Sequence, residues 1–304
     1  MTTVADFEPQ RPRLFGLAYR MLGSAHDAED VLQDAWLRWS GADRAVIESV
    51  PAWLATVVTR LCLTRLTSAR ARRESYPGPW LPEPVPTDAQ ELGPLDTAEQ
   101  RESVSLALLV TLERLTPAER AVYVLREAFG YGHRDIAGVL DLDEAHCRQL
   151  YRRARQHIDG HTTAQPPPDR ATWLQLVERF LTAANDGDLP ALESMLAADV
   201  TAWSDGGGKV SAARRPVHGR EEVARFVAGV LRLRRTEGLV VTVADVNGAP
   251  AVLAWIGAQL IAVTSIEVVD ERVATVRFVV NPEKLGYLAA RTTPPGGVRA
   301  TSHS

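Results

Sequence analysis

The sequence contains few lysines and no long apolar run. Among its 34 basic residues only Lys209 and Lys284 are lysines. No stretch of about 18 consecutive apolar residues is present, so no membrane span is expected. The opening residues carry charge and proline where a signal peptide needs an apolar core, which favours a cytoplasmic location.

The scarcity of cysteine excludes further classes of structure. Cys62 and Cys147 are the only cysteines, and both fall on the apolar faces of predicted helices. A disulfide framework is therefore not expected, and a reducing compartment fits. No group of side chains has the spacing of metal ligands, so we expect neither a metal nor a cofactor. The net charge of −4 hides blocks of opposite charge along the chain.

Residues 116 to 158 have the pattern of a helix-turn-helix. Thr116, Pro117 and Glu119 form a helix-start signal ahead of apolar residues at helical spacing, and Asp143 is the expected N-cap of the last helix. One face of that helix is apolar. The opposite face carries Arg148, Gln149, Arg152, Arg153 and Arg155. Four arginines alone fit a solvated helix face as well, but after a turn and two helices they predict binding to DNA phosphates and base edges.

Two helices of opposite charge precede this motif. The helix expected at 26–39 carries acids early, where they favour the helix dipole, although Asp34 lies beyond the first turn. The helix expected at 52–73 carries arginines with no acid among residues 60–73. Residues 76–100 are rich in proline and acid and predict an extended linker. Three consecutive prolines in residues 165–169 mark a second boundary, because they end a helix.

The remaining sequence predicts a domain of another class. Helices are expected first, with a strand at 200–204 between them. Alternating β-rich runs follow from residue 239, with an Asn247-Gly248 hairpin turn and a second turn at 270–272. Helices followed by an antiparallel meander indicate an α+β domain with a curved sheet around a cone-shaped pocket.

The order of these elements resembles the two-domain extracytoplasmic-function sigma factors of bacterial RNA polymerase. Three short motifs, WLPEP at 80–84, DGGGK at 205–209 and NPEKL at 281–285, are similar to those of the subgroup with a fused C-terminal SnoaL-like, NTF2-like domain. The resemblance covers nearly the whole chain. It implies a sigma factor, without chemistry of its own, that recruits core polymerase to −35/−10 promoters.

The resemblance also implies a division of the chain. Two all-α DNA-binding domains precede the α+β cone domain. The expected segments are a region 2 domain at 5–75, an acidic proline-rich linker at 76–101, a region 4 helix-turn-helix domain at 102–162, the NTF2-like domain at 169–290 and a disordered tail at 291–304.

Roles for individual residues follow from the same resemblance. The residues implied to dock on the clamp coiled coil of the β′ subunit are Asp27, Glu29, Asp30, Gln33 and Asp34. Those implied to hold the −10 element are Arg60, Arg65, Arg70, Arg72 and Arg73. The last helix of the helix-turn-helix would read the −35 element, with Arg148 and Gln149 near bases and Arg152, Arg153 and Arg155 on phosphates. Thr64 and Thr67 stand where such sequences often carry a charged residue.

The fused domain is expected to regulate the sigma module through contacts between domains. The residues implied in these contacts are Trp80, Leu81, Pro82, Glu83, Asp205, Gly206, Gly207, Gly208, Lys209, Asn281, Pro282 and Lys284. An alternative is a sensor for a small apolar ligand, or a residual cyclase or isomerase using Asp205, His218 and Trp203. A plain helix-turn-helix repressor is a third candidate, but it has no need of the acidic helix.

Overall fold

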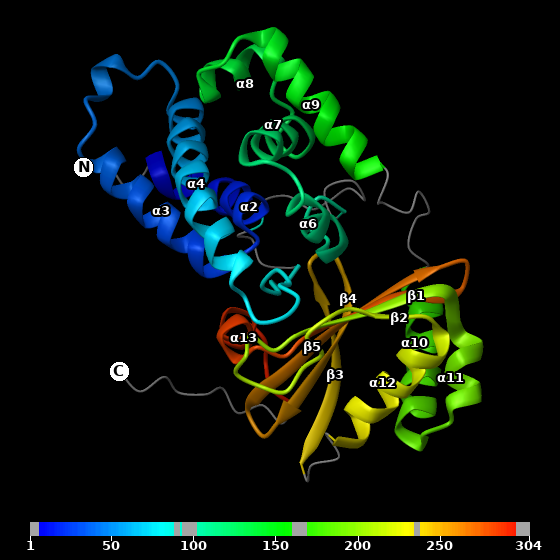
Figure 1. The fold of residues 1–304 in the computed structure, drawn as a ribbon. Coiled ribbons are helices and arrows are strands. Elements are labelled where there is room, and N and C mark those ends of the chain that lie inside the picture. Colours follow the sequence, from blue (N-terminus) through cyan, green and yellow to red (C-terminus); the bar gives the residue numbers. More distant parts are fainter. Residues whose placement is uncertain (1–5, 88–91, 93–101, 160–168, 234–237, 296–304) are drawn as a thin grey trace. The chain divides into compact units, whose positions relative to one another are not determined.

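The computed structural model describes residues 6–87, 92, 102–159, 169–233 and 238–295, excluding the side chains of 69–74 and 233 (Figure 1). Its internal contacts define two compact units. The first comprises Met1–Ser75 with Thr87–Thr162, and the second comprises Tyr76–Pro86 with Thr163–Ser304. The expected disorder at 291–304 falls largely on residues 296–304, which lie outside the described chain.

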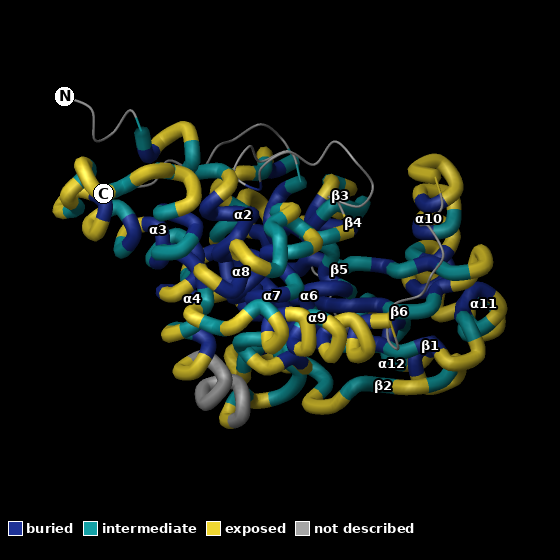
Figure 2. Tube along the Cα trace, turned by 90° about the horizontal axis from the view of Figure 1, so that it is seen from above, coloured by how far each residue is buried: buried dark blue, intermediate teal, exposed yellow. Residues whose placement is uncertain are grey.

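The first unit is entirely helical in its described part. Its elements are η1 (Glu8–Gln10), α2 (Arg11–Leu22), α3 (Ala25–Ser40), η2 (Arg44–Val46), α4 (Val50–Glu74), α6 (Leu106–Leu112), α7 (Pro117–Glu127), α8 (His133–Leu140) and α9 (Glu144–Asp159). The dark-blue segments of Figure 2 mark the residues that α2, α3 and α4 bury. Both cysteines lie in this unit and are free and buried, as their positions on apolar faces predicted.

Local signals place the helix ends where the sequence predicts them. Ser24 caps α3 by accepting a hydrogen bond from the Asp27 amide at 3.0 Å. Thr116 and Glu119 form a capping box at the start of α7, which satisfies otherwise orphaned amides. The Asp143 carboxylate accepts from the His146 amide at 2.8 Å and begins α9.

Within the first unit, α7 is tied to α2 by a buried arginine. The Arg120 guanidinium donates two hydrogen bonds to the Arg20 carbonyl, at 3.1 and 3.0 Å, and one to Glu113 Oε1 at 2.5 Å. The Arg20 side chain in turn donates to Ser103 Oγ. Burial lowers the pKa of Arg120 to about 9 and that of Arg20 to about 10, so both stay charged near neutrality.

The second unit combines helices with one mixed sheet. Its elements are α10 (Arg170–Asp186), α11 (Leu189–Met195), β1 (Leu196–Asp205), β2 (Val217–His218), α12 (Arg220–Leu233), β3 (Leu239–Val246), β4 (Ala249–Ile256), β5 (Gln259–Val269), β6 (Arg272–Val279) and α13 (Pro282–Ala289). The strand order is β2-β1-β6-β5-β4-β3. The fold class and the meander from β3 to β6 are confirmed, including left-handed backbone at Asn247 and Gly248.

The pairing of the first and last long strands was not anticipated. β1 runs parallel to β6, with Asp205 opposite Val279. Because parallel strands end at the same edge of a sheet, the end of β1 lies beside the start of α13. The motifs DGGGK (205–209) and NPEKL (281–285) therefore meet at this edge of the sheet.

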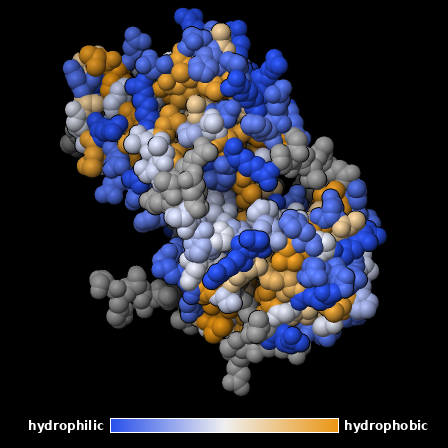
Figure 3. Space-filling model, viewed as in Figure 1, coloured by the Kyte–Doolittle hydropathy of each residue, from blue (hydrophilic) through white to orange (hydrophobic). Residues whose placement is uncertain are grey.

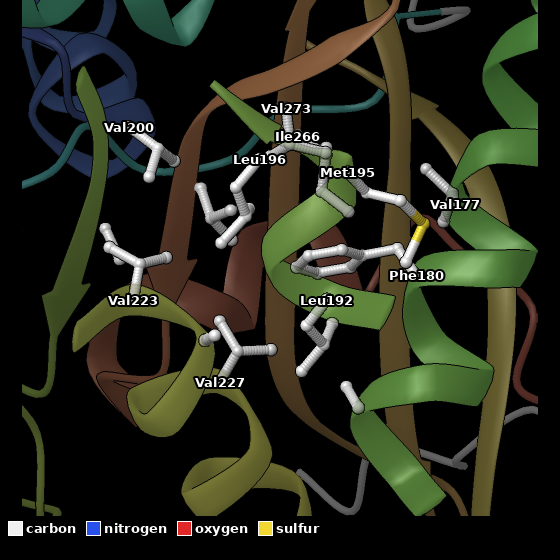
Figure 4. Close-up of a cluster of buried hydrophobic side chains, with 14 of the residues drawn as sticks. Val177, Phe180, Leu192, Met195, Leu196, Val200, Val223, Val227, Ile266 and Val273 are labelled. Atoms are coloured by element: carbon white, nitrogen blue, oxygen red, sulfur yellow. The ribbon is translucent and has the colours of Figure 1, made fainter. Parts of the chain in front are cut away.

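Apolar side chains fill the layer between the sheet and α10 to α12. Phe180 of α10 points toward Leu192 and Met195 of α11, and the sheet adds Ile266 and Val273 (Figure 4). The α13 helix packs against β5 and buries Leu285 and Leu288, outside that cluster. None of the described helices is long and apolar enough to cross a membrane.

Candidate functional site

The centre of the site is Asp205, whose side chain has no solvent exposure. Its backbone carbonyl accepts hydrogen bonds from the amides of Val280 and Asn281, both at 2.9 Å, which fixes the end of β1 to the chain entering α13. Its carboxylate is aimed at the segment 76–86. We call this segment the strap, because it crosses the end of the sheet although it precedes α10, the first helix of the domain, by more than 80 residues.

Both oxygens of the Asp205 carboxylate are satisfied. Oδ2 accepts from Lys284 Nζ at 2.7 Å and from the Leu81 amide at 2.8 Å. Oδ1 accepts from the Tyr76 hydroxyl at 2.5 Å and from the Gly207 amide at 3.1 Å. Burial, followed by the hydrogen bond to Asp205, raises the pKa of Tyr76, so its phenol remains a donor.

Lys284 joins the strap and the domain from the opposite side. Its ammonium donates to the Leu81 carbonyl at 2.6 Å as well as to Asp205. It also lies 4.1 Å from the centre of the Trp80 ring and 4.9 Å from that of Tyr76. Aromatic faces stabilise a desolvated cation. The buried ammonium is therefore compensated by a carboxylate, a backbone carbonyl and two aromatic rings.

The glycines of DGGGK are needed for close approach. Gly207 has φ +59°, and a Cβ there would lie 2.2 Å from Asn281 Nδ2 and 3.0 Å from the Tyr76 hydroxyl. At Gly208, with φ +72°, a Cβ would lie 2.9 Å from Pro77 Cγ. Side chains at these positions would push the strap away.

The final motif residue, Lys209, lies at the surface with 57% of its side chain exposed. Its ammonium is 3.1 Å from Glu283 of the same domain. Of the two lysines in the sequence, Lys284 is therefore the one that holds the strap.

A second anchor holds the far end of the strap. The Asn247 amide donates to the Val85 carbonyl at 2.9 Å, and the Val85 amide donates to Asn247 Oδ1 at 3.1 Å. Pro86 then forms a single antiparallel bridge with Val246 at the end of β3. Residues 81–86 are all buried, which includes Pro82 and Glu83. Residues 76–86 of the predicted linker form no helix and belong to the packed interior of the second unit.

In the first unit, the predicted docking acids meet an arginine of α4. Arg65 Nη1 lies 3.1 Å from Asp30 Oδ2 and 3.6 Å from Asp27 Oδ1, while Arg65 Nη2 lies 3.1 Å from Asp34 Oδ2. Glu29 pairs with Arg11 at 2.5 Å. Gln33 is exposed.

The arginine face of α9 is accessible. Arg148, Gln149, Arg152, Arg153 and Arg155 are all exposed, while Cys147, Leu150 and Ala154 are buried on the other side. The surface over α9 is accordingly hydrophilic in Figure 3. Arg148 pairs with Glu144, and Arg155 pairs with Glu127 and Asp159. Among the described side chains, no ion-pair partner lies within reach of Arg152 or Arg153.

Three segments of the chain match families of known proteins. Family models match residues 7–72 (sigma-70 region 2), 105–158 (sigma-70 region 4) and 177–285 (SnoaL-like domain). The chain is 39% identical over 311 residues to the ECF RNA polymerase sigma factor SigJ of Mycobacterium tuberculosis, covering 97% of each protein. The chain belongs to the extracytoplasmic-function sigma factors. It is also 32% identical over 290 residues to the probable sigma factor SigI of the same species, covering 94% of this chain and 96% of SigI.

A solved structure extends the similarity to the fold. The crystal structure of the M. tuberculosis sigma factor SigJ matches with a TM-score of 0.72 at 35% identity, covering 93% of this chain and 98% of that one. The chain is therefore a sigma factor, with helical regions 2 and 4 and an NTF2-like C-terminal domain. Core RNA polymerase and promoter DNA are the partners of a protein of this class.

The arginines predicted on α4 of this sigma factor have different surroundings. Arg60 donates through Nε to the Val139 carbonyl of α8 at 3.1 Å, and Arg65 faces three carboxylates. The side chains of Arg70, Arg72 and Arg73 lie outside the described residues. Their role at the −10 element stays a prediction.

The acid and histidine suggested for an enzymatic cone do not come together in the sigma factor. His218 pairs with Thr201 on β2 and β1, four residues from Asp205, which is about 13 Å along a strand. All four partners of the Asp205 carboxylate are already in place. The arrangement does not favour the enzyme alternative.

The sequence did not indicate the surroundings of two residues at the strap and of one exposed apolar residue on α3. The sequence predicts Tyr76 as a linker residue and Asn247 as a turn residue. In the structure the Tyr76 hydroxyl donates to Asp205, and Asn247 Oδ1 accepts from the Val85 amide of the strap. Leu37, on α3 beyond the predicted docking acids, is 61% exposed. An apolar residue at i+4 from Gln33 on an otherwise polar face was the available signal for Leu37. No comparable local signal marked the other two.

Proposed function

We propose that the C-terminal domain of this sigma factor restrains its own DNA-binding regions by holding the strap. The observation that carries this proposal is the buried group formed by Asp205, Lys284 and the backbone of Leu81. The strap is covalently part of the linker between regions 2 and 4. A domain that binds the linker therefore limits how far the two regions can separate.

The length of the linker shows how strong this restraint can be. Residues 76–101, fully extended, reach about 85–95 Å at about 3.3–3.6 Å per residue. When 76–86 are held, the remaining 15 residues (87–101) reach only about 50 Å. Elements centred 25 nucleotides apart are separated by about 85 Å of duplex at about 3.4 Å per nucleotide. Release of the strap frees residues 76–86 from their fixed path, so the linker can change its direction as well as its reach.

The remaining assignments follow from family membership and surface chemistry. We propose that α3 docks on the β′ clamp, that α4 approaches the −10 element, and that α9 reads the −35 element. The protein would act in the cytoplasm and catalyse no reaction itself. Side chains between the sheet and α10 to α12 are apolar. A ligand that binds in this layer and thereby releases the strap would have to be apolar as well.

In vitro transcription from a cognate promoter tests the restraint. The full-length protein is compared with the double variant Asp205→Asn/Lys284→Met, which removes both buried charges together, and with Lys209→Ala as a matched control. Lys209 carries the same charge but lies at the surface. We expect more transcript from the double variant and unchanged transcript from the control. Equal output from all three proteins would remove the regulatory role of the strap.

A further inference from the structure

We propose that Arg65 is a positioning residue for the polymerase-docking surface of α3 and does not contact promoter DNA. The inference rests on the proposed docking of α3. It reassigns an arginine that the sequence places among the −10 contacts. The basis is the set of carboxylates that surround its guanidinium.

The geometry uses both ends of the guanidinium. Nη1 serves Asp30 at 3.1 Å and Asp27 at 3.6 Å, and Nη2 serves Asp34 at 3.1 Å. The three aspartates stand at i, i+3 and i+7, which places them along one face of α3. One side chain from α4 thus spans two turns of the neighbouring helix. The planar fork of arginine suits such multiple carboxylate contacts, whereas a lysine offers a single point charge.

The local charge opposes a phosphate contact at this position. Three carboxylates around one guanidinium leave a net charge of −2, counting −3 from the aspartates and +1 from Arg65. A DNA phosphate approaching Arg65 would meet this negative field and would have to displace bonds already made. A basic partner surface would be attracted by the same field.

The bonds to Arg65 also leave the acids usable. Asp30 and Asp34 each give Oδ2 to the arginine, and their side chains remain 41% and 44% exposed. No described side chain bonds Oδ1 of either residue. Each carboxylate is therefore oriented by one oxygen and offers the other to a partner. Without Arg65, three like charges would repel one another along the helix and sample more rotamers.

Exposed residues that continue the same helix complete the surface. Gln33 and Leu37 lie one turn apart, at i+3 and i+7 from Asp30. Leu37 is 61% exposed and supplies an apolar contact beside the acids. Glu29 is held separately by Arg11. The surface combines oriented acids with an apolar residue, which fits a basic partner helix that has apolar side chains of its own.

The test measures two affinities of the full-length protein. The first is its affinity for core polymerase, and the second is the affinity of the assembled holoenzyme for promoter DNA at several salt concentrations. For Arg65→Ala we expect core affinity to fall roughly tenfold, with promoter affinity and its salt slope unchanged. Arg65→Lys should recover part of the loss. Arg152→Ala serves as the matched control and should show the opposite pattern.

A second comparison separates positioning from general damage to the fold. In an Asp30→Asn/Asp34→Asn background, Arg65→Ala should cause no additional loss of core affinity, because the groups it positions are already neutral. If Arg65→Ala lowers core affinity as much in this background as in the wild-type protein, the inference is wrong. A normal core affinity together with a reduced salt slope for promoter binding would also overturn it. If Asp30→Asn/Gln33→Ala also leaves core affinity unchanged, the docking role of α3 is itself wrong.

Discussion

Lys284 Nζ lies 2.7 Å from Asp205 Oδ2, with 8% and 0% of the two side chains exposed. The two residues come from the end of β1 and from α13, and each also bonds the backbone of Leu81. A buried ion pair adds little net stability over apolar residues, but the loss of one partner leaves a costly unpaired charge. The pair therefore makes the position of the strap sensitive to single substitutions.

The first prediction concerns this pair. Lys284→Met should lower the free energy of unfolding of the second unit by about 3–5 kcal/mol, because the Asp205 charge stays buried. Asp205→Asn/Lys284→Met should recover more than half of that loss. Urea unfolding followed by tryptophan fluorescence measures both. A double variant less stable than Lys284→Met would contradict the explanation by unpaired charge.

The second prediction uses the hydroxyl of Tyr76. Tyr76→Phe removes one donor to Asp205 and one acceptor for Asn281 Nδ2, and should cost about 1–3 kcal/mol near neutral pH. The native pKa of Tyr76 is raised, so its contribution is fully present below the unfolded value near 10 and is lost as pH rises toward the higher native value. The gap in unfolding free energy between the two proteins should narrow from pH 8 to 11, and a gap that widens there would refute the assignment.

The third prediction separates backbone strain from steric clash at a glycine. Gly207 and Gly257 have φ of +59° and +57°, but a Cβ meets Asn281 Nδ2 at 2.2 Å in the first and nothing within 4 Å in the second. Gly257→Ala should cost about 1–2 kcal/mol for the left-handed backbone alone. Gly207→Ala should cost clearly more and release the strap to proteases. Thermal unfolding and limited proteolysis compare the two, and equal behaviour would show that the close packing around Gly207 is unimportant.

The fourth prediction concerns the reading helix. Arg152→Ala should weaken promoter binding across sequences and reduce the slope of log affinity against log salt by about one. Gln156→Ala, on an exposed position of the same helix, should leave the slope unchanged. Fluorescence anisotropy of the holoenzyme with labelled promoter DNA gives both slopes. An unaltered slope in Arg152→Ala would exclude Arg152 as a phosphate contact.

Local signals in the sequence predicted much of the fold. Thr116 with Glu119, and Asp143, define helix starts through bonds that span three residues, and such patterns are visible along the chain. The run at 239–246 matches β3 residue for residue. The helix-turn-helix and the meander follow from patterns of this kind.

The functional centre could not be derived in the same way. Tyr76 and Asn281 are 205 residues apart, and Lys284 and Leu81 are 203 apart. No local periodicity encodes contacts at that separation, and motif resemblance grouped these residues without showing which of them touch. The exposed position of Lys209 and the buried position of Lys284 likewise depend on the parallel pairing of β1 with β6.

The parallel pairing of β1 and β6 also sets an order of events during synthesis. Both DNA-binding regions leave the ribosome before the last strand and α13 exist, and the strap must wait 203 residues for Lys284. At about 5–20 residues per second this delay lasts roughly 10–40 s. In the later part of that interval, after residue 158, a nascent chain carries complete regions 2 and 4 on a linker that nothing from the C-terminal domain yet restrains.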